Sequence, residues 1–221
     1  MKKKSILMAA IAVMLVAVLV VGGTLAYFTD TKSATNTFTV GDVKITLDES
    51  NVNDPSGDRV TSNEYTGMLP GIQYKKDPVV TNTGKNDAYV RAVVTIENGM
   101  NWMGLYNENI WTAPQAEAFK KLICNKMGEG WSLEDYNYVA NAERGSTDFV
   151  AVLKYDGVLA AGKATSAMFE KVMLPTNATA SDITTRVAQN GVFHIDVVAQ
   201  AIQADGFTSW NDAFKAFDAQ K

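Results

Sequence analysis

The sequence contains a single histidine, His194, and this count limits the chemistry that the chain can perform. A catalytic serine triad and a two-histidine zinc site each need more, because one imidazole cannot serve as two ligands or as both ligand and base. The sequence also lacks an H-E-x-x-H motif, a glycine-rich phosphate loop and a paired Cys-x-x-Cys. We therefore predict no catalytic, cofactor-binding or metal-binding residues, no cofactor and no enzymatic activity, and interpret His194 as a partly exposed strand residue.

Two other features carry reactive groups. Asp48, Glu49, Asp54 and Asp58 form an acid-rich loop that could offer oxygen ligands to calcium, but their spacing does not match an EF-hand, and an ordinary solvated loop is favoured.

Cys124 is the only cysteine, so an exported chain has no intramolecular disulfide to rely on. It could be a reactive thiol, but we favour a small apolar residue at the flank of a helix.

The first 26 residues have the order of charged and apolar segments that is typical of a secretory signal peptide. Three lysines at positions 2 to 4 precede an apolar run, Ile6 to Val21, that has no charged residue. A helix over this run would be about 24 Å long, which is short of the ~30 Å hydrocarbon core, so an uncleaved anchor is the less favoured alternative. Small residues at Thr24 and Ala26 place the cleavage before Tyr27.

The remaining 195 residues fit one sizeable domain with a core of its own. Removal of the three leader lysines leaves 17 basic against 24 acidic residues, a net charge of −7. This net negative charge argues against nucleic acid or anionic lipid as a partner. The chain is expected to contact the membrane only through the signal peptide, before cleavage.

Short strands separated by turn signals dominate this domain. Residues 48–66 are polar and predict a surface loop, and residues 82–87 predict a turn. The fold class that we predict is mainly β: a jelly-roll-like two-sheet sandwich over residues 38–221, with one or two short helices. Strands are expected around residues 38–40, 43–48, 79–81, 90–96, 149–155, 168–174 and 193–201.

Two helices are expected to interrupt the strands. The first follows start signals at Thr112 and Pro114 and would pack across the end of the sheets. Its apolar face comprises Ala116, Phe119, Leu122, Ile123 and Met127. The second lies within residues 208–221, where Ser209 can cap the helix and Trp210, Phe214 and Phe217 share a face.

Several segments resemble the TasA and camelysin (CalY) family of exported Gram-positive proteins. The specific likeness is GGTLAYFTDTKSATNTFTVGDVKITL at residues 22–47, and it continues through LPGIQYKKDPVVTNTGKNDAYVRAVV at residues 69–94. Weaker likeness is found in LAAGKATSAMFEKVMLP and FHIDVVAQAIQADGF. The sequence departs from TasA around residues 100–145, so surface features are not transferred there.

The resemblance implies a secreted jelly-roll subunit of the extracellular matrix or cell surface. A SipW-type signal peptidase would release the N-terminus, and the segment at residues 27–37 would then add as a strand to the next copy of the chain. In this sequence, the polymerisation segment begins with Tyr27, Phe28, Thr29, Asp30 and Thr31. A frayed terminus is the alternative, because most domain ends are poorly ordered.

Two other functions stay open. Camelysin-like proteins are also described as surface metalloproteases, although no zinc-protease spacing occurs in this sequence. A monomeric adhesin or ligand-binding domain would fit the aromatic residues Trp102, Tyr106 and Trp111, which are more often packing residues.

The cleavage site is directly testable. Because Thr24 and Ala26 are the small residues that a signal peptidase reads, the secreted protein should begin at Tyr27. A bulky residue in place of Ala26 should leave precursor in the membrane. Mass spectrometry of the extracellular protein checks this, and an intact Met1 there would contradict it.

Overall fold

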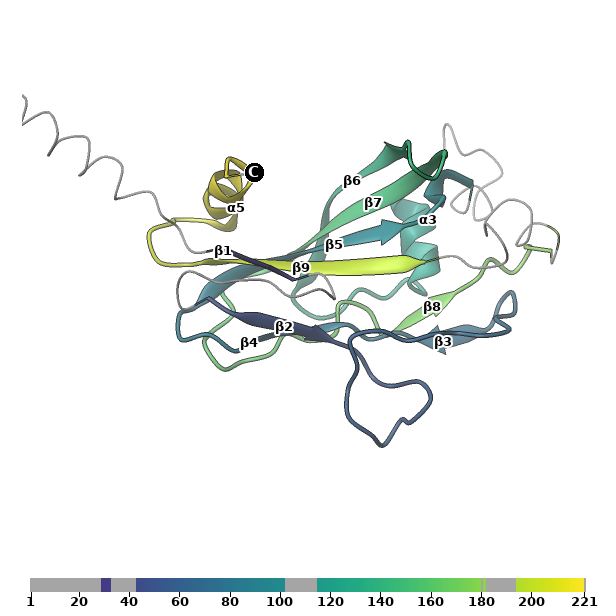
Figure 1. Cartoon of the computed structure of the whole chain (residues 1–221), viewed down its shortest axis with the longest axis horizontal. Helices are drawn as coiled ribbons and strands as arrows, with labels where there is room; N and C mark the ends of the chain where they lie inside the picture. The colour runs from purple at the N-terminus through teal and green to yellow at the C-terminus, as the bar shows by residue number, and fades with distance from the viewer. Residues whose placement is uncertain (1–28, 33–42, 102–114, 180, 182–193, 221) are drawn as a thin grey trace, which may run out of the picture.

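The computed structural model of the chain describes residues 29–32, 43–101, 115–179, 181 and 194–220, and these ranges are mainly β (Figure 1). The predicted fold class is confirmed in this respect. The strands are β1 (Thr29–Lys32), β2 (Ile45–Asp48), β3 (Gln73–Lys75), β4 (Val79–Asn82), β5 (Ala88–Ile96), β6 (Trp131–Asn141), β7 (Ser146–Tyr155), β8 (Lys171–Met173) and β9 (Ile195–Gln203), and the helices are α3 (Gln115–Leu122) and α5 (Trp210–Asp218).

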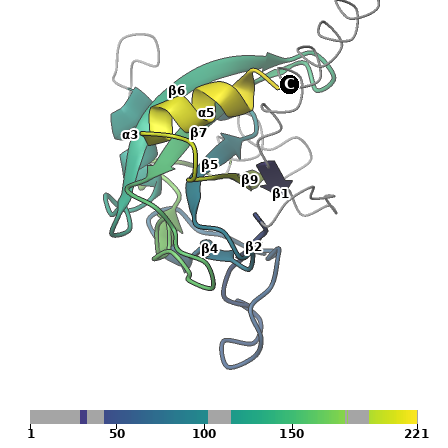
Figure 2. The ribbon, with the colours of Figure 1, turned by 90° about the vertical axis from the view of Figure 1, so that its left-hand side faces the viewer.

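The strands form two layers. The larger layer is a five-stranded antiparallel sheet in the order β1-β9-β5-β7-β6. The second layer consists of two two-stranded sheets, β2-β4 and β3-β8, instead of one continuous sheet. Figures 1 and 2 place this second layer on one side of the five-stranded sheet and α5 on the other.

The central strand β5 shows why the sequence folds into two layers. Val90, Ala92, Val94 and Ile96 alternate along β5 and are completely buried, as predicted. Each large aliphatic side chain that is fully enclosed contributes on the order of 1.5–3 kcal/mol. This face of β5 therefore anchors the core between the layers.

The rest of the core comes from both layers and from α3. Ile45 and Val80 enter from β2 and β4, while Phe149 enters from β7. Phe119 of α3 stacks on Phe149 with ring centroids 5.9 Å apart. Because α3 contacts both β6 and β8, it closes one end of the two layers, as the sequence predicted for this helix.

Helix α3 is shorter than predicted. It ends at Leu122, because Cys124 and Asn125 adopt left-handed backbone angles with φ of 57° and 58°. Met127, predicted on its apolar face, instead forms an isolated bridge with Phe169 beyond the helix. The predicted start signals, Thr112 and Pro114, lie outside the described residues.

Strand β6 was not predicted. It is an edge strand whose middle is exposed, and of its residues only Trp131 is buried. Its pairing with β7 shifts register between Leu133 and Asp135, which breaks the alternation that would reveal a strand. The predicted strand at residues 168–174 is also shorter, since β8 covers only Lys171–Met173.

The C-terminal helix α5 is confirmed. Ser209 caps it by accepting a hydrogen bond from the backbone N–H of Asp212 at 3.1 Å. Trp210, Phe214 and Phe217 are buried and form a second, smaller core with Ile202 of β9.

Several predictions fall outside the described residues: the signal peptide over 1–26, the strand at 38–40 and the residue Phe193. Among the described residues, helices are too short and polar to cross a bilayer.

Candidate functional site

The segment predicted to pair with a neighbouring subunit pairs here with its own chain. Thr29, Asp30 and Thr31 lie in β1, which forms an antiparallel ladder with β9 from Thr29 opposite Ile202 to Lys32 opposite Ala199. The other predicted residues of this segment, Tyr27 and Phe28, and the cleavage residues Thr24 and Ala26 lie outside the described ranges. β1 is therefore an edge strand that pairs with β9, although the two strands are far apart in the sequence.

Strand β9 is a preformed template for this addition. All nine of its residues, Ile195–Gln203, are paired with β5 on the side opposite β1. Ala199 and Ala201 are completely buried toward the core, as their predicted strand face required. The position of β9 is thus set by β5 and the core, while β1 pairs with its second side and also contacts β2 of the other layer.

Helix α5 holds the same stretch of β9 from the outer face of the sheet. The Trp210 indole N–H donates to the Val90 carbonyl at 2.9 Å. The Arg91 Nε donates to Gln200 Oε1 at 2.6 Å, and its Nη1 reaches Asp218 Oδ2 at 2.8 Å. Gln200 is also the residue opposite Thr31 in the β1–β9 ladder. The polar network therefore lies on the outer face of the sheet, at the position where β1 pairs with β9.

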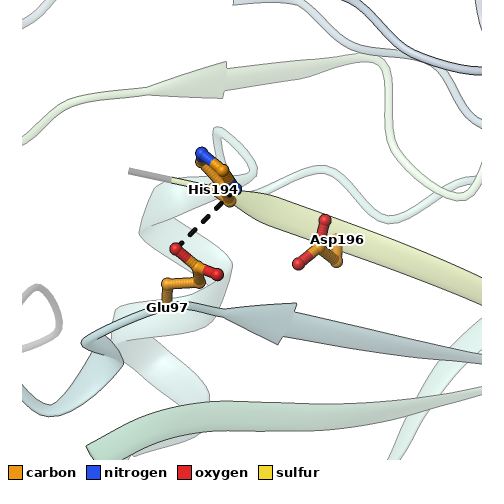
Figure 3. A group of neighbouring side chains, drawn as sticks. All are labelled: Glu97, His194 and Asp196. Atoms are coloured by element: carbon orange, nitrogen blue, oxygen red, sulfur yellow. Dashed lines mark ion pairs between the residues drawn. The ribbon is translucent and has the colours of Figure 1, made fainter. Parts of the chain in front are cut away.

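At the other end of β9, His194 lies beside two carboxylates (Figure 3). The Glu97 N–H donates to the His194 carbonyl at 3.1 Å, and antiparallel pairing puts both side chains on one face. Asp196, two residues further on, shares this face. The His194 Nδ1 is 3.7 Å from Glu97 Oε2, and one ligand atom from each of the three residues lies within 4.8 Å of the others.

His194 is partly exposed, as predicted, with 56% of its side chain accessible. Sequence reasoning did not find its neighbours, because Glu97 is far away in the chain. The missing signal was the register of β5 against β9, in which Ile96 faces Ile195.

Glu97 is oriented by a charged network. Arg144 Nη1 contacts Glu97 Oε1 at 2.9 Å, and Arg144 Nη2 contacts Asp148 Oδ2 at 2.5 Å. Asp148 Oδ1 accepts a hydrogen bond from the Asn98 N–H at 3.0 Å. Burial disfavours the charged form of Asp148, but hydrogen bonds from Asn98, Asn141 and Arg144 outweigh it and hold the pKa of Asp148 below its ordinary value.

The acid-rich loop does not bring its carboxylates together. Asp48 pairs with Arg59, which also reaches Asp77, and Glu49 pairs with Lys76 at 3.0 Å. The only group of three potential metal ligands found among the described residues is the one at His194. The carboxylates of Asp48 and Glu49 are thus paired with basic side chains, and calcium binding by this loop has no support from the described residues.

Cys124 lies just beyond α3 and is partly buried. Burial is the main cause that raises the pKa of its thiol, so the reactive thiolate is disfavoured. This agrees with a packing role. The aromatic residues Trp102, Tyr106 and Trp111 lie outside the described residues.

Comparison with known families gives one match. The model of the camelysin metallo-endopeptidase family matches residues 1–89. The resemblance to the TasA and camelysin family is confirmed over this part of the chain. No curated protein and no solved structure matches the chain.

At the level of the family, the match supports a secreted or cell-surface protein. The description of that family names a metallo-endopeptidase, but the match ends at residue 89 and includes none of the residues around His194. Glu97, His194 and Asp196 present one imidazole nitrogen and two carboxylates on one face, a chemistry that suits a divalent ion. Among the described residues, these three could hold such an ion.

The network behind Glu97 predicts a specific acid sensitivity. The pKa of Asp148 is lower in the folded state than in the unfolded state, where it is about 3.9. The ionised Asp148 therefore stabilises the fold fully at pH values above this unfolded-state pKa, and this stabilisation is lost as the pH falls through the folded-state pKa. Asp148→Asn should lower the free energy of unfolding by about 1–3 kcal/mol at neutral pH. The gap to wild type should shrink below about pH 4.

Urea unfolding followed by tryptophan fluorescence across this pH range measures the effect. Asp156→Asn is the matched control, because the Asp156 carboxylate is exposed and only loosely paired with Lys154 at 3.9 Å. It should change the free energy of unfolding by less than about 0.5 kcal/mol. A deficit of Asp148→Asn that does not vary with pH would contradict the ionic role.

Proposed function

We propose that the protein is a secreted subunit of cell-surface or biofilm-matrix fibres, and that subunits join by exchange of β1. The observation that carries this proposal is the position of β1 as an added edge strand on a template that β5 and α5 hold independently. A strand in this position can leave β9 of its own chain and pair with β9 of the next.

The acceptor is suited to exchange because it survives the loss of β1. β9 keeps its full ladder with β5, and Gln200 stays bound to Arg91. Without β1, the backbone groups of residues 199–202 on the open side of β9 would lack partners. Such an edge is a template for strand pairing, and a copy of β1 fits the same register.

The energetics favour exchange at high protein concentration. A swapped strand makes the same main-chain hydrogen bonds, each worth about 0.5–1.5 kcal/mol, as the strand it replaces. The net free energy therefore depends on the cost of association and on the new packing interactions that form between subunits. Because donor and acceptor are different surfaces, each subunit can give one strand and receive one. Exchange from copy to copy in sequence produces an open filament, whereas reciprocal exchange between two copies produces a closed dimer.

Processing would act as the switch for assembly. The predicted cleavage site directly precedes Tyr27, so an uncleaved signal helix would stay attached two residues before β1. The bulk and apolar character of that helix would keep β1 away from the acceptor of a neighbour. We propose a SipW-type signal peptidase and other copies of the chain as its partners.

A surface metalloprotease is the second candidate. The family description favours it, and so does the group around His194, which lies outside the matched residues 1–89. Its signature is chelator-sensitive cleavage of casein by the purified protein. If His194→Ala abolished this cleavage without unfolding the protein, the sequence-based prediction of no enzymatic activity would be wrong.

Removal of the exchange strand tests the proposed function. A chain starting at Phe38 lacks β1 and should stay folded, because the β5–β9 ladder and the α5 cluster contain no β1 residue. It should also stay monomeric, because it has no β1 to give to a neighbour. A chain starting at Tyr27 should form filaments that lengthen with protein concentration. Sedimentation and electron microscopy at matched concentration distinguish the two.

Two outcomes would contradict strand exchange. Filaments of equal length from both chains would remove the role of β1. Filaments from neither chain would favour the monomeric adhesin. Circular dichroism of the shorter chain confirms that it retains the β structure.

A further inference from the structure

We propose that Glu97, His194 and Asp196 form a binding site for a divalent transition-metal ion of the zinc class. The three residues lie on the outer face of the sheet where β5 ends and β9 begins (Figure 3). His194 and Asp196 are exposed, so an ion from solution can reach them. Asp196 lies in β9, and Glu97 and His194 are the residues next to the paired ends of β5 and β9, joined by the Glu97 N–H to His194 carbonyl hydrogen bond, so most of the site is preformed.

The observed separations are close to those that a metal requires. Zinc bonds to imidazole nitrogen and carboxylate oxygen are roughly 2.0–2.2 Å long, so ligand atoms around a tetrahedral zinc lie about 3.3–3.6 Å apart. His194 Nδ1 and Glu97 Oε2 are 3.7 Å apart, too far for a good hydrogen bond but near this spacing. The widest separation in the group, 4.8 Å at most, needs only a small side-chain rotation.

The charge balance also favours a dication. Arg144 contacts Glu97 through Oε1, which leaves Oε2 directed at His194. The positive charge of Arg144 is matched by Asp148 at 2.5 Å. Glu97 and Asp196 therefore give the group two negative charges that this network does not balance. Arg144 acts as the outer partner that orients a metal-binding carboxylate.

The donor set selects the class of ion. Calcium and magnesium prefer all-oxygen sites, whereas an imidazole nitrogen favours zinc and neighbouring transition metals. Three protein ligands leave one tetrahedral position for water. The site lies at the opposite end of β9 from the residues that pair with β1, so this inference does not depend on fibre formation.

Metal binding by the processed chain is the test. After chelator treatment and dialysis, the protein is titrated with zinc by calorimetry and with cobalt by visible absorption, which reports a nitrogen- and oxygen-ligated tetrahedral ion. One ion should bind per chain. Both His194→Ala and Asp196→Asn should weaken zinc binding at least roughly tenfold and remove the cobalt band.

Asp205→Asn is the matched control, because it removes an exposed carboxylate beyond the other end of β9 and should bind zinc as wild type does. Circular dichroism shows whether each variant is folded, and the exposed position of His194 and Asp196 makes folding of both expected. The proposal is overturned if wild type binds no zinc at millimolar concentration, or if His194→Ala binds zinc as tightly as wild type. Calcium binding that equals zinc binding in wild type would likewise overturn it, since that result requires an oxygen-only site.

Discussion

Strand β9 can pair through its backbone on both of its sides, and the rest of the account depends on this property. One side is satisfied by β5 along Ile195–Gln203, and β1 satisfies the other along residues 199–202. Unpaired backbone groups on a sheet edge attract any available strand. Residues 29–32, shortly after the predicted cleavage site, therefore have a defined place at this edge of their own chain.

The two faces of the sheet at β9 have different uses. Its inner face contributes Ala199 and Ala201 to the core between the layers. Its outer face is covered by α5 near Gln200 and carries the carboxylates and imidazole around His194 at the other end. The proposed assembly and the proposed ion binding would thus involve separate parts of one strand, so a variant can test either proposal without affecting the other.

Strong local patterns in the sequence predicted the parts of the fold that burial controls. The alternation from Val90 to Ile96 identified β5, and the capping serine with three aromatic residues identified α5. β6 was missed because an exposed edge strand need not alternate. The C-terminal end of α3 was misplaced because the left-handed backbone at Cys124 and Asn125 has no glycine to reveal it.

The candidate sites were predictable only in part. Family resemblance pointed to the segment from Tyr27 to Thr31, but neither resemblance nor pattern showed that β1 pairs with β9 of its own chain. The neighbours of His194 depend on strand register, which a single sequence does not specify when the strands are distant in the chain.

A reversible cross-link between β1 and β9 tests strand exchange most directly. Asp30 and Ala201 face each other in the ladder, and opposite residues of an antiparallel pair lie about 4.5–5.5 Å apart, within disulfide range. In a Cys124→Ser background, Asp30→Cys with Ala201→Cys should give no filaments when oxidised as a monomer, and filaments once reduced. Oxidation after assembly should then yield a covalent ladder of multimers on a non-reducing denaturing gel. Filaments formed by the locked monomer, or assembled filaments that contain only intramolecular disulfides, would contradict the exchange of β1 between subunits.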